Sequence, residues 1–179
     1  MLEIEIPARE LFNDSTGEFI YVNACTLRLE HSLVSLSKWE SKWCKPFLSK
    51  EQKTSEELTD YIKCMTLTQN VDPRVYDIIG NENLMKINKY IESPMSATTF
   101  GPDKSKPNRE IVTSELIYYW MISLNIPFEC QKWHLNRLLT LVKVCSIKNQ
   151  PPKKMSKGEI LSRNAALNAA RRKQLNTTG

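Results

Sequence analysis

Hydrophobic and polar residues alternate at the start of the chain and then take on helical spacing. Apolar residues at every second position of 2–6 are separated by glutamates, the pattern of a strand with one buried face. Residues 14–17, Asp-Ser-Thr-Gly, supply turn chemistry before the apolar segment 18–22. We therefore predict a hairpin, followed by a third strand near 25–31. A sheet this small needs helices to cover it.

From Ser32 onward, apolar residues recur at intervals of three and four, which indicates an amphipathic helix. Ser32 is a good N-cap for this helix, and Lys45-Pro46 would end it. Thr54 and Glu57 form a capping box for a second helix. The residues that we expect these helices to bury are Leu33, Leu36, Trp39 and Trp43 on the first and Leu58, Tyr61, Ile62 and Met65 on the second.

Two shorter helical segments are expected next. Asp72 and Pro73 suit the N-cap and first position of a short helix, which Gly80 would close. A further helix is predicted over 81–91, and its inward-facing residues would be Leu84, Ile87 and Ile91. Residues 93–110 contain three prolines and a glycine, which predicts a long exposed loop.

Two strongly apolar helices are predicted after this loop, and such pairs usually form the centre of a domain. The first begins at Thr113, and Pro127 forces a turn before the second, which continues to residue 145. The residues expected to be buried are Leu116, Ile117, Tyr119, Trp120, Met121, Ile122 and Leu124 on the first helix and Phe128, Leu135, Leu138, Val142 and Cys145 on the second.

The end of the chain is predicted to be a separate arm. Residues 146–159 contain four lysines and two consecutive prolines, which favours a linker that is partly stiff. Ser156 and Glu159 form a capping box for a final helix with few large apolar residues. We expect this helix to bind another molecule or a neighbouring copy, and a solvated helix without a partner is the alternative. The candidate partner-binding residues are Ile160, Leu161, Leu167, Arg171, Arg172 and Leu175.

These patterns predict an α+β, predominantly α-helical protein. A small N-terminal hairpin or sheet packs on a helical bundle in residues 1–148, and residues 149–179 form the Pro/Lys linker and the basic C-terminal helix. No apolar run approaches the roughly 20 residues that cross a bilayer, and the acidic start does not resemble a signal peptide. We therefore expect an intracellular, soluble protein without membrane partners, in which the five cysteines remain reduced.

The charge distribution separates the two parts more sharply than the net charge of +5 indicates. Residues 1–142 carry 16 Lys and Arg against 19 Asp and Glu, whereas 143–179 carry 9 against Glu159 alone. An extended basic arm is attracted to an acidic protein surface or to nucleic acid.

Candidate chemistry is sparse, and each candidate has a structural alternative. Cys130 and His134 have the spacing of two metal ligands on one helix face, but the only other histidine is His31, which favours a histidine in the core. A Cys/His nucleophilic pair would need an orienting group and an activated thiol, and neither is indicated. We find no glycine-rich phosphate loop and no catalytic motif, so we expect neither enzymatic activity nor a cofactor.

Nucleic-acid binding by the N-terminal part has two weak indications. The four tryptophans could stack on bases, but their helical spacing among aliphatic residues favours core packing. The two helices around Pro127 superficially resemble a helix-turn-helix, yet the second offers chiefly Lys132 and Arg137 as exposed basic residues. We therefore favour a structural role for both features.

The chain resembles the tail assembly chaperones of long-tailed, siphovirus-type bacteriophages. The resemblance covers nearly the whole chain and lies in the order of an N-terminal β segment, LRLEHSLVSLSKWESKW, KTSEELTDYIKCMTL, IVTSELIYYWMISLNIPFECQKWHLNRLLTLVKVC and the basic end SRNAALNAARRKQLNTTG. The resemblance identifies no active-site residue in this chain, because the family has no catalytic signature.

The resemblance implies a non-structural protein that acts by non-covalent binding. Its partners would be the tape measure protein and tail tube subunits, with a homo-oligomer or a longer frameshifted form as further associations. It would act in the host cytoplasm and be absent from the mature virion. The alternative is a nucleic-acid-binding phage regulatory protein that uses the basic C-terminal arm, and nucleic acid is the less favoured partner.

Overall fold

The computed structural model describes residues 1–13, 17–101, 110–150 and 156–176. The fold is α+β and predominantly helical, as predicted, with its strands at the N-terminus. Contacts between residues divide the chain into two compact units, Met1–Ile147 and Lys148–Gly179. We call them the N-terminal unit and the C-terminal arm. Most of the predicted turn at 14–17 and the Pro151-Pro152 part of the linker lie outside the described residues.

Four short strands form a ribbon of two antiparallel pairs: β1 (Leu2–Ile6), β2 (Arg9–Asn13), β3 (Glu18–Val22) and β4 (Cys25–Leu29). β1 pairs with β4 and β2 pairs with β3. The strand predicted near 25–31 is therefore present, but the expected pairing of the first strand with 18–22 is wrong. Pro7 lacks an amide hydrogen and lies where the ladder between the two pairs is interrupted.

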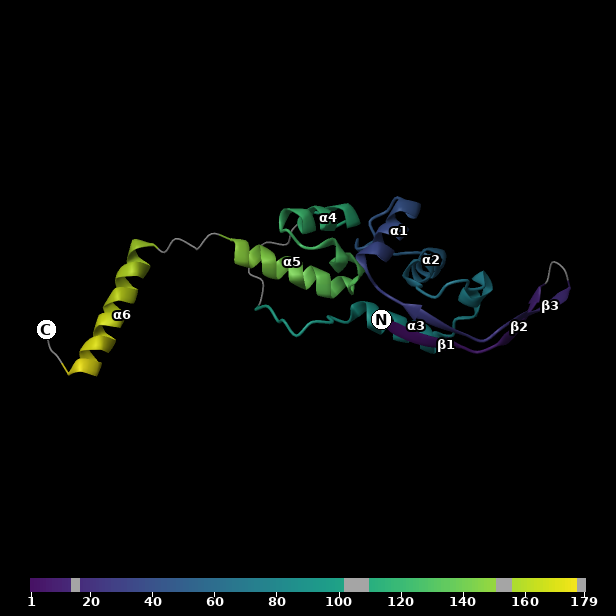
Figure 1. The fold of residues 1–179 in the computed structure, drawn as a ribbon, viewed down its shortest axis with the longest axis horizontal. Coiled ribbons are helices and arrows are strands. Elements are labelled where there is room, and N and C mark those ends of the chain that lie inside the picture. The colour runs from purple at the N-terminus through teal and green to yellow at the C-terminus, as the bar shows by residue number, and fades with distance from the viewer. Residues whose placement is uncertain (14–16, 102–109, 151–155, 177–179) are drawn as a thin grey trace. The chain divides into compact units, whose positions relative to one another are not determined.

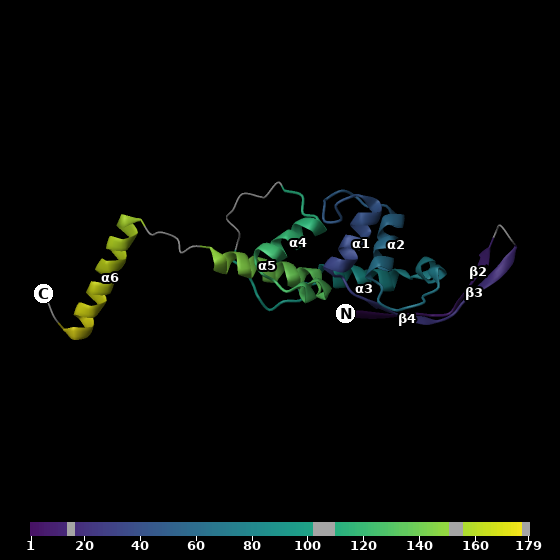
Figure 2. The ribbon, with the colours of Figure 1, turned by 45° about the horizontal axis from the view of Figure 1, so that its top comes forward.

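The ribbon contributes one face to the core, as the alternation predicts. Ile4 and Ile6 on β1 and Leu27 and Leu29 on β4 are buried, whereas Glu3 and Glu5, which alternate with the apolar residues of β1, are exposed. The edge of β4 that faces away from β1 is covered by Leu67, whose N–H donates to Arg28 O at 2.7 Å. The pair β2–β3 continues beyond β1–β4 and extends past the helices of the N-terminal unit (Figure 1 and Figure 2).

The first two helices, α1 (Leu33–Trp43) and α2 (Ser55–Met65), pack against each other. Both predicted caps are present: the Ser32 and Thr54 hydroxyls accept backbone N–H bonds in the first turn of their helices. The Trp39 indole donates to Glu57 O at 2.8 Å across the interface. Leu58 was predicted to be buried but is exposed, because the buried face of α2 is centred on Tyr61 and Met65.

The next two elements are η1 (Pro73–Ile78), a 3-10 helix, and α3 (Asn81–Glu92). The Asp72 carboxylate accepts the Arg74 N–H at 3.0 Å, which confirms the predicted cap. Gly80 is the N-cap residue of α3 and so begins that helix. Figure 1 shows α3 beside β1, and the two elements are in contact.

The next elements are α4 (Ser114–Ser123), η2 (Phe128–Lys132) and α5 (Leu135–Asn149), and α5 lies in the N-terminal unit up to Ile147. The described residues between α3 and α4 form the predicted loop. Residues 128–132 form a separate 3-10 helix, so the continuous helix predicted after Pro127 is wrong there. Ile117 and Met121 make the buried face of α4, and the residues predicted to be buried but found exposed are Tyr119, Ile122 and Phe128.

A buried polar junction joins the end of the ribbon to the start of α5. Leu135 N–H donates to His31 O at 2.7 Å, and the rings of His31 and His134 meet edge to face with centroids 5.1 Å apart. His31 Nδ1 hydrogen-bonds the Tyr61 hydroxyl of α2 at 2.6 Å. The junction therefore connects three elements that are far apart in sequence.

The same junction holds the end of α3. His134 Nε2 donates to Tyr90 O at 3.0 Å, and the Asn136 amide donates to Ile91 O at 2.9 Å. The Tyr90 hydroxyl donates to the Glu30 carboxylate at 2.7 Å, and that carboxylate also pairs with the N-terminal amine at 3.0 Å. Burial, followed by the neighbouring His134, lowers the pKa of His31 to about 4.

Acid should therefore destabilise the protein through His31. The unfolded chain, with a histidine pKa near 6.5, binds a proton that the folded chain excludes, so the free energy of unfolding falls as the pH decreases from about 6.5 to about 4. His31 should account for about 2 kcal/mol of the loss between pH 7 and pH 4.5, as measured by urea unfolding. His31→Gln should show a shallower pH dependence, and an unchanged slope would contradict this account.

Candidate partner-binding surfaces

The C-terminal arm contains α6 (Lys157–Leu175), which begins with the predicted capping box. Glu159 N–H donates to the Ser156 hydroxyl at 3.2 Å, and Ser156 N–H donates back to the Glu159 carboxylate at 2.8 Å. These bonds lower the pKa of Glu159. The helix ends where Asn176 adopts a left-handed conformation and its N–H donates to Arg172 O. Both ends of α6 are therefore capped by local residues.

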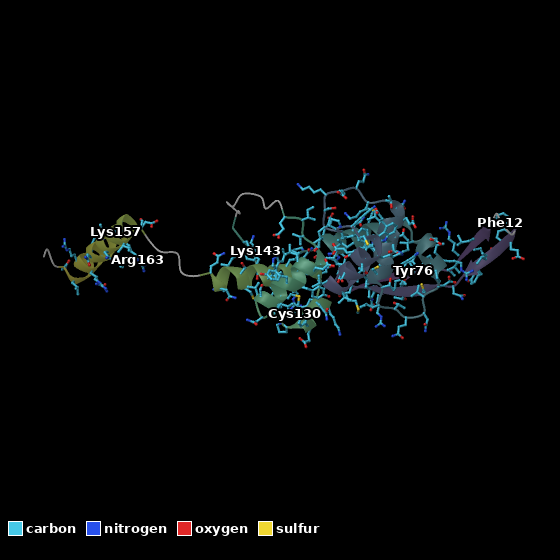
Figure 3. The ribbon with its side chains drawn as sticks, turned by 90° about the horizontal axis from the view of Figure 1, so that it is seen from above. Phe12, Tyr76, Cys130, Lys143, Lys157 and Arg163 are labelled. Carbon is cyan, nitrogen blue, oxygen red and sulfur yellow. The ribbon has the colours of Figure 1, made fainter. Side chains whose placement is uncertain are left out.

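The predicted partner-binding residues all lie on α6, and no side chain of this helix is buried. At about 100° per residue, its large apolar side chains fall within an arc of roughly 120°. Arg171 projects from within this arc and Arg172 from its border, whereas the remaining positions are mostly small or polar. Figure 3 shows Lys157 and Arg163 on the same helix. The arm thus presents a narrow apolar stripe beside basic side chains, and its binding to a partner stays a prediction.

The N-terminal unit has an apolar groove with a volume of about 680 Å³, which sequence reasoning missed. It lies between the segment that follows α1, the segment that precedes α4, and the helices α4 and α5. The apolar side chains that line it are Leu48, Ile111, Val112, Trp120 and Leu139. Lys50, Glu51 and Glu110 also line it, so the groove combines apolar walls with charged side chains of both signs.

The buried carboxylate of Glu40 on α1 ties together the two segments that line the groove. One oxygen accepts the Phe47 N–H at 2.9 Å, and the other accepts the Ser114 N–H at 2.7 Å. The Phe47 ring stacks on Tyr61 with centroids 3.8 Å apart, which anchors this segment to the core. Glu40 is therefore a positioning residue for the groove.

Of the two residues considered as a metal or nucleophilic pair, His134 has structural partners and Cys130 is buried. Both ring nitrogens of His134 are engaged, because Nε2 bonds Tyr90 O and Nδ1 accepts the Asn136 N–H at 3.3 Å. Cys130 is buried in η2. Burial raises the pKa of the Cys25 and Cys64 thiols, which reduces their thiolate content. Within the described ranges, no group of three or more His, Cys, Asp or Glu could hold a metal ion.

The tryptophans do not form a stacking platform. Trp39 is buried, and the Trp43 indole donates to the Asp60 carboxylate at 2.9 Å. The Arg137 guanidinium lies 4.2 Å from the centroid of the Trp133 ring. Trp120 lines the groove and is the one tryptophan available to an apolar partner there.

Comparisons with known proteins give no match: no family model, no curated protein sequence and no solved structure is significantly similar to the chain. Of the helices in the described residues, none has the length and apolar character needed to span a membrane.

Removal of the Glu40 carboxylate should strongly destabilise the segments beside the groove. In Glu40→Ala, the partly buried Phe47 N–H and the buried Ser114 N–H lose a charged acceptor, which should lower the free energy of unfolding by about 3 kcal/mol. Glu40→Gln keeps one acceptor oxygen and should lose less. Glu56→Ala, at an exposed position of α2, is the control and should change stability by less than about 0.5 kcal/mol in urea unfolding. Equal stabilities of Glu40→Ala and the control would contradict this role.

Proposed function

We propose that the protein is a bacteriophage tail assembly chaperone. It binds the tape measure protein non-covalently and recruits tail tube subunits during tail assembly, in the host cytoplasm and without entering the mature virion. The proposal rests on the resemblance along the chain and on two surfaces suited to protein partners. It assigns no catalytic step, because binding alone can keep an aggregation-prone client soluble.

The apolar groove is the observation that carries the proposal. Ile111, Trp120 and Leu139 line an open surface on the N-terminal unit, although residues of this kind are usually buried. An amphipathic helix that lays its apolar face into such a groove is a common mode of peptide recognition. A long helical client offers such faces repeatedly, so the groove can cover one of them during assembly.

The C-terminal arm supplies a second contact of different character. Its apolar stripe is too narrow for strong binding alone, but its arginines attract acidic surfaces. Two weak contacts on one chain give a higher combined affinity when a single client can reach both. The arm therefore adds affinity and charge selectivity to the apolar contact in the groove.

Exposed basic residues on α6 favour one alternative, a nucleic-acid-binding phage regulatory protein. Binding of this kind would weaken steeply with added salt, because it is driven by the release of counterions from phosphates. It would depend on Arg171 and Arg172 and would be insensitive to changes in the groove.

A matched pair of substitutions tests the groove. Ile111 lines the groove and is 62% exposed, whereas Ile122 on α4 is 60% exposed and is not among the lining residues. Ile111→Glu should reduce capture of the protein encoded just downstream, on co-expression, at least tenfold, because a carboxylate would be desolvated in the contact. Ile122→Glu should leave capture unchanged.

The measurement is the amount of the downstream protein that co-purifies as a soluble complex, determined by size exclusion with light scattering. Equal capture by both variants would exclude the groove as the client site. Failure of the unaltered chain to capture this protein, together with salt-dependent binding to DNA or RNA, would favour the alternative.

A further inference from the structure

The β2–β3 pair carries exposed aromatic side chains and open strand edges. Phe12, Phe19 and Tyr21 lie on one face of the pair, because Phe12 is opposite Phe19 and Tyr21 is two residues further along β3. All three side chains are exposed, and Phe19 reaches 72%. Figure 3 shows Phe12 near the far end of the ribbon. Among the described strands, β2 and β3 pair only with each other.

A two-stranded pair of this kind is marginally stable alone and is a template for further pairing. Natural proteins usually protect open edges with lysine, proline or an inward-pointing charge. β3, with the sequence Glu-Phe-Ile-Tyr-Val, has none of these between Phe19 and Val22. Its edge is therefore suited to accept another strand.

We infer that β3 pairs with β3 of a second copy of this chain, antiparallel and about a two-fold axis at Ile20. The two ribbons then form one four-stranded sheet in the order β2-β3-β3-β2. This inference goes beyond the proposed function, because it assigns an interface between two copies that involves neither the groove nor the C-terminal arm.

The sequence of β3 is complementary to itself in this register. Ile20 lies opposite Ile20 of the partner subunit, and Phe19 lies opposite Tyr21 of the partner subunit. Aromatic pairs across strands are among the more stabilising cross-strand contacts. Within each copy, the Phe12 and Phe19 rings are already 5.1 Å apart. The partner's Tyr21 therefore extends an existing aromatic row from two rings to three.

The charges on the opposite face of the sheet are also complementary. Arg9 lies opposite Val22 within one copy, and Val22 lies opposite the partner's Glu18 in this register. Arg9 and the partner's Glu18 thus share one row and one face, about 10 Å apart at the backbone, which long side chains can span. The two Glu18 residues lie at opposite ends of the β3 pair, so like charges are kept apart.

Pairing through the β2 edge fits less well. A two-fold axis at Leu11 would place Glu10, which lies opposite Tyr21 in its own copy, opposite the partner's Phe12, so a carboxylate would interrupt the aromatic row. The charges do not distinguish the two edges, because Arg9 would lie across one strand from the partner's Glu18 in either register. The uninterrupted aromatic row therefore selects the β3 edge.

Disulfide trapping tests this register with a matched control. In the full chain with Cys44→Ser to remove the exposed thiol, Ile20→Cys should form a covalent dimer with oxidised glutathione, because the two Cα atoms lie one strand spacing apart. Leu11 lies opposite Ile20 in the same ribbon and is also half-buried. Leu11→Cys should not cross-link, because its partner would be three strand spacings away, about 14 Å. Cross-linking of Leu11→Cys at the same or a higher rate would overturn the inference.

A second measurement does not require oxidation. Tyr21 is 59% exposed and Tyr119 on α4 is 62% exposed, so each can be replaced by aspartate with little direct effect on the core. Analytical ultracentrifugation of the full chain should show a dimer that weakens at least tenfold in Tyr21→Asp and is unchanged in Tyr119→Asp. A monomer in the unaltered chain at high concentration, or equal dimerisation of both variants, would overturn the inference.

Discussion

The buried junction between residues 30–32 and 134–136 is the constraint on which the N-terminal unit depends. Leu135 N–H bonds His31 O, and His134 bonds Tyr90 O, so the starts of α1 and α5 and the end of α3 meet at one place. Polar groups this deeply buried are costly unless each is hydrogen-bonded, so the arrangement tolerates little displacement. Neutral histidines suit the junction because each ring can both donate and accept.

The groove depends on this framework through Glu40. The junction sets the start of α1, and α1 carries Glu40 to the side where Phe47 and Ser114 offer their N–H groups. Those bonds hold the segment before α4 beside the segment after α1, and the apolar walls of the groove lie on both. The apolar side chains that line the groove are therefore held in place by polar contacts to a buried carboxylate.

Local signals in the sequence predicted the elements well. Caps at Ser32, Thr54, Asp72 and Ser156 depend on residues a few positions apart, and all four are present. The prediction that the apolar residues of β1 face inward was also correct, because side chains of a strand with one buried face alternate with a period of two.

Predictions that depended on contacts between segments far apart in the sequence failed for identifiable reasons. β1 pairs with β4 because Pro7 and the break after Val22 divide one long hairpin into two pairs, which the turn residues alone do not reveal. Tyr119 and Ile122 are exposed because a helix with apolar residues all round does not specify which face packs inward. Phe128 is exposed on the separate 3-10 helix η2, so it does not share the buried face of α5. The groove was missed since its walls come from separate segments, although the apolar pair Ile111-Val112 just before the Thr113 cap was a usable signal.

Hydrogen exchange tests the central claim, that the groove and the arm together bind a helical protein partner. The full chain would be measured alone and in complex with the protein encoded just downstream. The account predicts slower exchange over 110–120 and over 157–175 in the complex, with no change in α1. Unchanged exchange over 110–120, with slowing confined to the basic arm or absent, would contradict it.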